Sequence, residues 1–302
     1  MPQGSVLGPL LFLLYINDIF SSSKILSFIL FADDTNIFFH HHNLTELSLI
    51  VNHELSLVST WLKVNKLTLH PDKTKFILFH PSRKKLDLND LNINIDHNSI
   101  ARVQSTKFLG IIIHENFSWQ PHIKAICSKI AKSIGIITKS RPYFHTSTLS
   151  LLYKSLILPY LQYCTIIWGS AYESHLNPLL LLQKKALRII THSPPRSHSR
   201  PLFKLQQTLN IYEIYKYQVC CFIYSHLNNL LPTPLYTFFS LNSSCHSYGT
   251  RKKDNLHVSF HKYSFSLCSQ GPLIWSKIPI DFRNKLNTST YKRTLQEYFL
   301  SL

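Results

Sequence analysis

Acidic residues are scarce in this chain. Its 302 residues include 15 Asp and Glu against 32 Lys and Arg, which gives a formal net charge of +17. An excess of cations on this scale points to a polyanionic partner, with nucleic acid favoured over an anionic membrane. The alternative is a basic surface that only keeps the protein in solution.

Long apolar runs are also missing. The longest, such as residues 6–16, are too short and too interrupted to cross a bilayer, and no basic stretch with an apolar core opens the chain. These absences argue against a secretory signal and a membrane helix. We therefore expect an intracellular protein without a membrane partner, in either the nucleus or the cytoplasm.

The six cysteines show no Cys-x-x-Cys spacing, which is typical of buried thiols in a reducing compartment rather than of a disulfide scaffold. A zinc site remains an alternative, although the spacing of its candidate ligands fits no finger or knuckle. Those ligands are Cys220, Cys221, His226, Cys245 and His246.

Charge is distributed unevenly along a chain that is 45% hydrophobic and long enough for more than one domain. Residues 1–100 contain 8 Lys and Arg and 9 Asp and Glu, a net charge of −1. Residues 101–302 contain 24 and 6, a net charge of +18. The polyanion-binding part is therefore expected in the second region.

Two adjacent carboxylates, Asp33 and Asp34, interrupt an apolar stretch over residues 28–39. Each flank has the composition of a buried strand, and residues 33–36 have turn chemistry, so we predict a tight hairpin with both carboxylates at its tip. Two neighbouring negative charges favour a hard divalent cation. A solvated turn without a metal is the alternative.

The remaining pattern predicts an α+β fold. We expect a loop over residues 2–9, a helix buried on all sides over 10–19, the hairpin over 25–39, and an amphipathic helix that begins at a capping box over 43–46. Short strands are predicted over 65–79 and 91–113. A basic amphipathic helix over 119–139 either tracks a phosphate backbone or is a solvated face. Further helices are predicted over 147–168 with a break at Pro159, 176–190, 202–230 and 291–302.

Four motifs occur in a characteristic order. They are Gln3-Gly4-Ser5-Val6-Leu7-Gly8-Pro9, Phe31-Ala32-Asp33-Asp34, Lys73-Thr74-Lys75 and Phe108-Leu109-Gly110. Their order and spacing closely resemble the reverse transcriptase of non-LTR retrotransposons, especially the jockey-like lineages. Later stretches around Leu158 to Trp168, Gln183 to Arg188 and Gly271 to Trp275 look like the carboxy-terminal region of such proteins.

The resemblance implies a role for each motif. Residues 1–115 would be part of a polymerase palm, 116–145 a thumb-like basic helix, and 146–302 a mostly helical carboxy-terminal region. Asp33 and Asp34 match the pair that binds Mg²⁺ or Mn²⁺, Lys73 a lysine near the triphosphate, and Gln3 and Gly4 a loop along the templating base and the incoming nucleotide. The remaining assignments are a primer grip at Phe108, Leu109 and Gly110, and nucleic-acid backbone contacts at Lys124, Lys129, Lys132 and Lys139.

The implied activity is RNA-directed DNA polymerisation, with an RNA template, a DNA primer and dNTPs as partners. Family members use a third carboxylate from an earlier strand, and this sequence opens directly on the Gln-Gly loop. We therefore expect a truncated chain that is inactive alone. The alternatives are a non-catalytic RNA- or DNA-binding remnant and an inert scaffold, while a group II intron maturase or a viral RNA polymerase fits the motifs less well.

Overall fold

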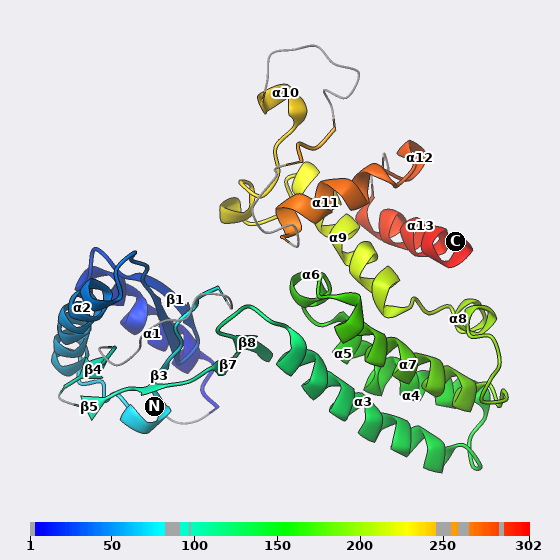
Figure 1. Ribbon diagram of the computed structural model, residues 1–302, viewed down its shortest axis with the longest axis horizontal. Coiled ribbons are helices and arrows are strands. Elements are labelled where there is room, and N and C mark those ends of the chain that lie inside the picture. The colour runs from blue at the N-terminus through cyan, green and yellow to red at the C-terminus, as the bar shows by residue number, and fades with distance from the viewer. Residues whose placement is uncertain (1–3, 82–90, 97, 246–254, 259–265, 284–286) are drawn as a thin grey trace. The chain divides into compact units, whose positions relative to one another are not determined.

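The computed structural model describes residues 4–81, 91–96, 98–245, 255–258, 266–283 and 287–302. The chain divides into two units (Figure 1). The first comprises Met1–Thr106 and His114–Phe117, and the second comprises Lys107–Ile113 and Ser118–Leu302. The sequence boundary between them cuts both strands of one hairpin, formed by β7 (Ser105–Phe108) and β8 (Ile111–His114), and assigns its turn to the second unit.

The first unit combines two longer helices with several very short strands. In chain order its elements are α1 (Leu7–Ile16), the 3₁₀-helix η1 (Asn17–Ser22), β1 (Ser27–Phe31), β2 (Asp34–Phe38), α2 (Leu44–Val64), η2 (Pro71–Lys73), β3 (Lys75–Phe76), β4 (Asn94–Ile95), β5 (Asn98–Ser99) and β6 (Ala101–Arg102). The strands form two-stranded sheets: β1 with β2 and β4 with β5 are antiparallel, and β3 with β6 is parallel. The predicted mixture of helices and small sheets is confirmed.

Helix α2 organises this unit because it contributes to two hydrophobic cores. Val58 packs with the β1–β2 hairpin, whereas Leu55 packs with Ile93 and Ile95 beside β4. The helix begins where predicted, because the Asn43 side chain accepts hydrogen bonds from the backbone amides of residues 45 and 46. Glu46 reaches the side-chain amide of Asn43 instead of its backbone, so the predicted capping box is only half formed.

Helix α1 departs from prediction in its burial. It was expected to be covered on all sides, but only Ile16 is buried, and Leu10, Leu13 and Leu14 are 55, 50 and 67% exposed. The prediction of a buried helix is therefore wrong. An apolar composition favours burial, but a helix face is buried only where another element covers it. None of the described residues covers the exposed face of α1.

The strand predicted just after α2 is absent. Lys66 adopts a left-handed φ of +55°, and the Leu67 amide donates a 2.8 Å hydrogen bond to the Leu62 carbonyl. This arrangement is a helix-ending motif, so these residues complete α2 instead of starting a strand. The strand predicted after the Pro-Asp turn is confirmed at β3, although it contains only two residues.

In its described residues, the second unit is mostly helical, with its share of the β7–β8 hairpin and one isolated β-bridge between Leu241 and Leu256. Its helices are α3 (Gln120–Ser140), α4 (Thr146–Leu156), α5 (Leu158–Gln162), α6 (Thr165–Trp168), α7 (Glu173–Ile190), α8 (Arg200–Leu205), α9 (Ile211–Leu227), η3 (Thr233–Leu235), α10 (Asn242–Cys245), α11 (Leu267–Ser276), α12 (Ile280–Arg283) and α13 (Thr288–Ser301). Helices α3 and α7 lie side by side, and α11 and α13 pack against α9 (Figure 1). One continuous core runs through this bundle, with Ile130, Ile137, Leu179, Val219 and Leu295 among its fully buried members.

The predicted helix over residues 202–230 is interrupted. Residues 206–210 separate α8 from α9, and Asn210 starts the second helix with a complete capping box: its side chain accepts from the Glu213 amide, and Glu213 accepts from the Asn210 amide. The four-residue pattern Asn-x-x-Glu is therefore a local signal for the start of α9, although the apolar periodicity predicted one continuous helix.

Two further expectations concern membranes and thiols. In the part of the chain that the structure describes, every helix is too short or too polar to cross a membrane. All six cysteines are free, but only Cys220 is buried, and Cys245 is exposed, so the prediction of uniformly buried thiols is wrong. His246, one of the candidate zinc ligands, lies outside the described residues.

Candidate functional site

A two-residue turn, Ala32 and Asp33, joins β1 to β2 and carries the carboxylate pair. Phe31 pairs with Asp34 across this turn, so Asp33 lies in the turn and Asp34 is the first residue of β2. Ala32 has a φ of +51°, as expected for the first position of a tight hairpin turn. Residues 35 and 36, predicted to belong to the turn, are paired strand residues instead.

Both carboxylates face solvent. Asp33 and Asp34 are exposed, and neither forms an ion pair with any residue that the structure describes. Two unpaired negative charges on adjacent residues repel each other, and a cation bound between them would remove that repulsion. The predicted position at the hairpin tip is therefore confirmed, and the tip is accessible to a ligand.

Hydrophobic packing against one face holds the hairpin in the described part of the first unit. Phe28 is buried in a small core with Ile19, Leu26 and Val58, against which Leu30 and Ile37 also pack. The ring of Phe20 meets that of Phe28 edge-on, with centroids 5.7 Å apart. This core anchors the base of the hairpin and leaves its turn free.

The opposite face of the hairpin is apolar but exposed. Ile29, Phe31 and Phe38 are 49, 57 and 42% exposed. They alternate along the two strands with the residues that contact the small core, of which Phe28 is buried and Leu30 and Ile37 are partly buried. The prediction that both flanks are buried strands is therefore wrong. A two-stranded sheet has two faces, and α2 covers one of them.

The Gln-Gly loop is only partly described. Gln3 lies outside the described residues. Gly4 is exposed in a turn with a φ of +94°, and a Cβ built on it would have no atom within 4 Å. A side chain at this position would be strained, and the glycine leaves the backbone open to a close ligand.

Lys73 is the last residue of η2 and is exposed. The backbone amides of Lys73 and Thr74 both donate 3.1 Å hydrogen bonds to the His70 carbonyl, which fixes the local turn. The Lys73 ammonium group forms no ion pair with Asp33 or Asp34 in the described part of the chain. The structure therefore does not join Lys73 to the carboxylate pair.

The Phe108-Leu109-Gly110 motif forms the end of β7 and its turn. Leu109 and Gly110 both have positive φ angles, 45° and 85°, which is the geometry of a two-residue hairpin turn. The Tyr163 hydroxyl donates a 2.6 Å hydrogen bond to the Leu109 carbonyl, and a Cβ on Gly110 would lie 3.2 Å from the Tyr163 ring. The turn is thus fastened to the junction of α5 and α6.

A buried histidine makes a second link to this hairpin. The amide of Ile112 in β8 donates a 3.3 Å hydrogen bond to Nδ1 of His122 in the first turn of α3. Burial, together with the charge of Lys129, lowers the pKa of His122 to about 4. The imidazole is therefore neutral at pH 7, as its acceptor role requires.

Three of the four predicted backbone-binding lysines share one helix face. Helix α3 buries Ile123, Ile126, Ile130, Ile134 and Ile137, and all four lysines are exposed. At 100° per residue, Lys124, Lys132 and Lys139 fall within one stripe opposite this buried face. Lys129 lies apart, with its ammonium group 5.2 Å from the centre of the Tyr160 ring.

A family profile described as reverse transcriptase (RNA-dependent DNA polymerase) matches residues 1–113. The matched range contains the carboxylate hairpin, the Gly4 turn, η2 and the Phe108–Gly110 turn. Residues 1–113 are a reverse transcriptase domain.

Curated relatives of the reverse transcriptase domain agree with this family. The chain is 25% identical over 202 residues to the probable RNA-directed DNA polymerase from transposon X-element of Drosophila melanogaster. It is 25% identical over 204 residues to the probable enzyme from transposon BS and 24% identical over 205 residues to that from mobile element jockey, both of the same species. The resemblance to jockey-like non-LTR reverse transcriptases is confirmed.

These alignments are longer than the reverse transcriptase domain, so the similarity continues into the helical unit. They cover 63–64% of this chain and 21–22% of each relative, so the chain spans about a fifth of the length of the curated relatives it matches. No solved structure matches the chain.

Proteins with a reverse transcriptase domain generally use divalent metal ions, and the carboxylate pair supplies the oxygen ligands that such ions prefer. Among the described residues, no group of three or more His, Cys, Asp and Glu side chains gathers in a way that could hold a metal ion. The assignment of Asp33 and Asp34 as metal ligands therefore stays a prediction.

Sequence reasoning missed the residues that position the Leu109–Gly110 turn. Tyr163 lies in a stretch already noted as similar to the carboxy-terminal region of the family, but nothing near it in the sequence indicates its partner. Its own carbonyl accepts a 3.0 Å hydrogen bond from the Trp168 indole, and Trp168 is fully buried. The aromatic residues between Leu158 and Trp168 were the sequence feature that could have indicated this contact.

Proposed function

We propose that this chain is part of the RNA-directed DNA polymerase of a non-LTR retrotransposon, with an RNA template, a DNA primer and dNTPs as its partners. Residues 1–115 act as part of the palm, residues 116–145 as a thumb-like helix, and residues 146–302 as an accessory helical region. The observation that carries the proposal is the exposed Asp33–Asp34 pair at an anchored hairpin turn inside a reverse transcriptase domain.

Asp33 and Asp34 are the residues that would hold magnesium or manganese. When bound, a pair of such ions activates the attacking primer hydroxyl and stabilises the leaving pyrophosphate. The chain's own contribution is to hold two carboxylates at a short turn, where they are accessible to solvent. Asp33 is proposed as the more direct ligand, because it lies in the turn itself.

The other motif residues position the substrates. Gly4, with open space where a side chain would be, lets the template and the nucleotide approach the backbone, and Gln3 lies beside it in sequence. Lys73 is an exposed cation for the triphosphate. The rigid turn of Phe108, Leu109 and Gly110 supports the primer end.

We further propose that the isolated 302-residue chain binds template-primer without extending it. The described residues offer two carboxylates, and two-metal nucleotidyl transfer needs more ligands than these two can provide. A segment or chain that brings a third carboxylate to the hairpin tip would complete the site.

The first experiment measures Mn²⁺ binding and primer extension with the same protein. Asp33→Asn and Asp34→Asn are compared with Asp72→Asn, which removes an exposed carboxylate from η2. We expect weaker Mn²⁺ binding in the two hairpin variants, unchanged binding in the control, and no extension by any of them. Unchanged Mn²⁺ binding in both hairpin variants would overturn the metal assignment, and extension that Asp33→Asn abolishes would overturn the claim of incompleteness.

A second candidate function is non-catalytic binding of RNA or DNA. It is favoured by the net charge of +18 over residues 101–302 and by the stripe of Lys124, Lys132 and Lys139. These lysines are 8 and 7 residues apart, which places them about 12 and 10 Å apart along the helix. Between them, Gly135 has no atom within 4 Å of an added Cβ, so a phosphate backbone can approach the helix closely.

Salt dependence tests this second function. Changing all three stripe lysines to Gln should reduce the slope of log affinity against log salt for duplex nucleic acid by about 2–3, because each phosphate contact contributes about 0.9. Lys129→Gln is the control, since Lys129 lies off the stripe over Tyr160. An unchanged slope in the triple variant, with duplex binding intact, would exclude the stripe as the binding face.

A further inference from the structure

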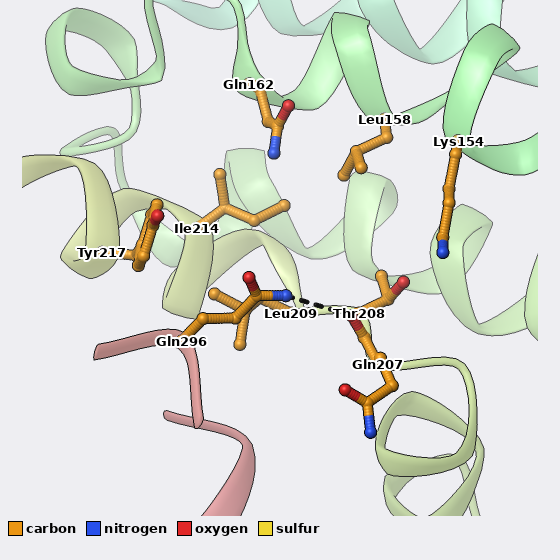
Figure 2. A pocket seen from close by; sticks show the side chains of 9 residues that line it. All are labelled: Lys154, Leu158, Gln162, Gln207, Thr208, Leu209, Ile214, Tyr217 and Gln296. Carbon is orange, nitrogen blue, oxygen red and sulfur yellow. Dashed lines mark hydrogen bonds between the residues drawn. The ribbon is translucent and has the colours of Figure 1, made fainter. Parts of the chain in front are cut away.

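The helical unit contains a pocket far along the chain from the carboxylate hairpin. Its volume is about 280 Å³, and its lining comes from α4, α5, the segment before α9, α9 itself and α13 (Figure 2). This volume is just below the range of about 300–1,000 Å³ that is typical of small-molecule sites, so the pocket has room for no more than about one nucleotide. All of its lining residues belong to the second unit.

The two ends of the pocket differ in chemistry. Lys154 lies at one end, and Tyr217 lies at the other, where Figure 2 shows its ring edge-on with a face turned toward the interior. Between them lie the side-chain amides of Gln162 and Gln296 and the apolar side chains of Leu158 and Ile214. From one end to the other, the pocket therefore presents a cation, two side-chain amides and an aromatic face to a ligand.

Several of these groups have unused binding capacity. Among the described residues, Lys154 has no ion-pair partner. The backbone carbonyl of Gln162 accepts a hydrogen bond from Gln218, but the side-chain amide of Gln162 has no hydrogen-bond partner among the same residues. Gln296 donates a 3.2 Å hydrogen bond from Nε2 to the Gln207 carbonyl, which orients its amide and leaves its oxygen available. Within the same described residues, the Tyr217 ring stacks on no other aromatic ring.

The charges around the pocket favour an anionic ligand. Lys154 is the charged residue of its lining, and no Asp or Glu lines it. Of the two nearby glutamates, Glu213 is paired with Arg200 at 2.7 Å, and Glu297 follows Gln296 on α13 with an exposed side chain. A neutral or cationic ligand would leave Lys154 unused.

We propose that this pocket holds one unpaired nucleotide of a single-stranded nucleic acid. The base stacks on Tyr217 and forms hydrogen bonds with the amides of Gln162 and Gln296, and its phosphate contacts Lys154. A glutamine amide offers both a donor and an acceptor, as base edges require, and unpaired bases are commonly bound by stacking on aromatic rings. The site lies in the second unit, outside the sequence range of the reverse transcriptase domain.

The test uses the full chain and a short single-stranded RNA that carries one 2-aminopurine, compared with a blunt duplex of the same sequence. The variants are Lys154→Gln and Gln162→Ala, both at exposed positions, and their double variant. Lys216→Gln is the matched control, because Lys216 is an exposed cation on α9 that does not line the pocket. Tyr217→Leu tests the stacking face.

We expect the double variant and Tyr217→Leu each to weaken single-strand binding by about fivefold or more, the lower end of the stacking range. The quenching of 2-aminopurine on binding should be lost in Tyr217→Leu, and blunt-duplex affinity should be the same in all pocket variants. Single-strand binding and quenching equal to those of the Lys216→Gln control would overturn the proposal, as would an equal loss on the duplex. Duplex binding through α3 and metal binding at Asp33 are separate readouts, so failure here leaves the proposed function untouched.

Discussion

The Tyr163 hydroxyl donates a 2.6 Å hydrogen bond to the backbone carbonyl of Leu109, 54 residues earlier in the chain. Leu109 lies in the turn of the β7–β8 hairpin, and Tyr163 lies between two short helices. The contact means that the shape of this turn depends on the helical unit as well as on its own glycine.

Removing that hydroxyl should loosen the turn without unfolding the chain. In Tyr163→Phe, we expect amide hydrogen exchange over residues 105–114 to accelerate by about two- to tenfold, the range for one lost hydrogen bond. Tyr160→Phe is the control, because its hydroxyl has no hydrogen-bond partner among the described residues. Equal exchange in the two variants would show that the contact does not restrain the turn.

Two glycines should respond to alanine in opposite directions. Gly110→Ala places a Cβ at a φ of +85° and 3.2 Å from the Tyr163 ring, and should lower the free energy of unfolding by about 1–2 kcal/mol. Gly135→Ala lies in the interior of α3 with open space around it, and should raise that free energy by about 0.5–1 kcal/mol. Urea denaturation measures both, and the same sign in both variants would contradict this account of the turn.

Acid should weaken the link between β8 and α3. Burial lowers the pKa of His122 from 6.5 to about 4, so between these values the unfolded chain binds a proton that the folded chain excludes. The contribution of neutral His122 to the free energy of unfolding is therefore fully present above pH 6.5. It decreases as the pH falls toward 4, by about 2–3 kcal/mol in all. The difference in unfolding free energy between wild type and His122→Gln, measured from pH 7 to pH 4, isolates this effect from the other histidines. A difference that does not vary with pH would exclude it.

Gln183 should be among the least replaceable polar residues of the helical unit. Its amide nitrogen donates to the Tyr153 hydroxyl at 3.1 Å and to the Leu209 carbonyl at 3.3 Å, and its oxygen accepts from the Ile211 amide at 2.8 Å. Gln183→Leu leaves these buried groups unpaired and should cost about 2–4 kcal/mol in urea denaturation. Gln218→Leu, which removes one hydrogen bond to the exposed Gln162, should cost much less.

Local patterns were enough to predict much of the fold. The tight hairpin around Asp33, the Asn43 cap of α2 and the isoleucine stripe of α3 were all visible in the sequence, because turns, caps and helical periodicity depend on residues a few positions apart. Errors arose where two local signals competed. The left-handed Lys66 ended a helix where a strand was expected, and the Asn210–Glu213 cap divided a helix that apolar periodicity had made continuous.

The amino-acid sequence by itself established the family, through the order and spacing of its motifs, and it placed the two carboxylates at a hairpin tip. Tertiary structure alone decided which apolar surfaces are covered: α1 and one face of the hairpin are exposed although their composition favours burial. It also decided what Tyr163 and Gln183 do, because their partners lie 26 to 54 residues away in the chain. Burial and long-range hydrogen bonds depend on which distant segments of the chain come into contact. Local secondary-structure propensity does not determine those contacts.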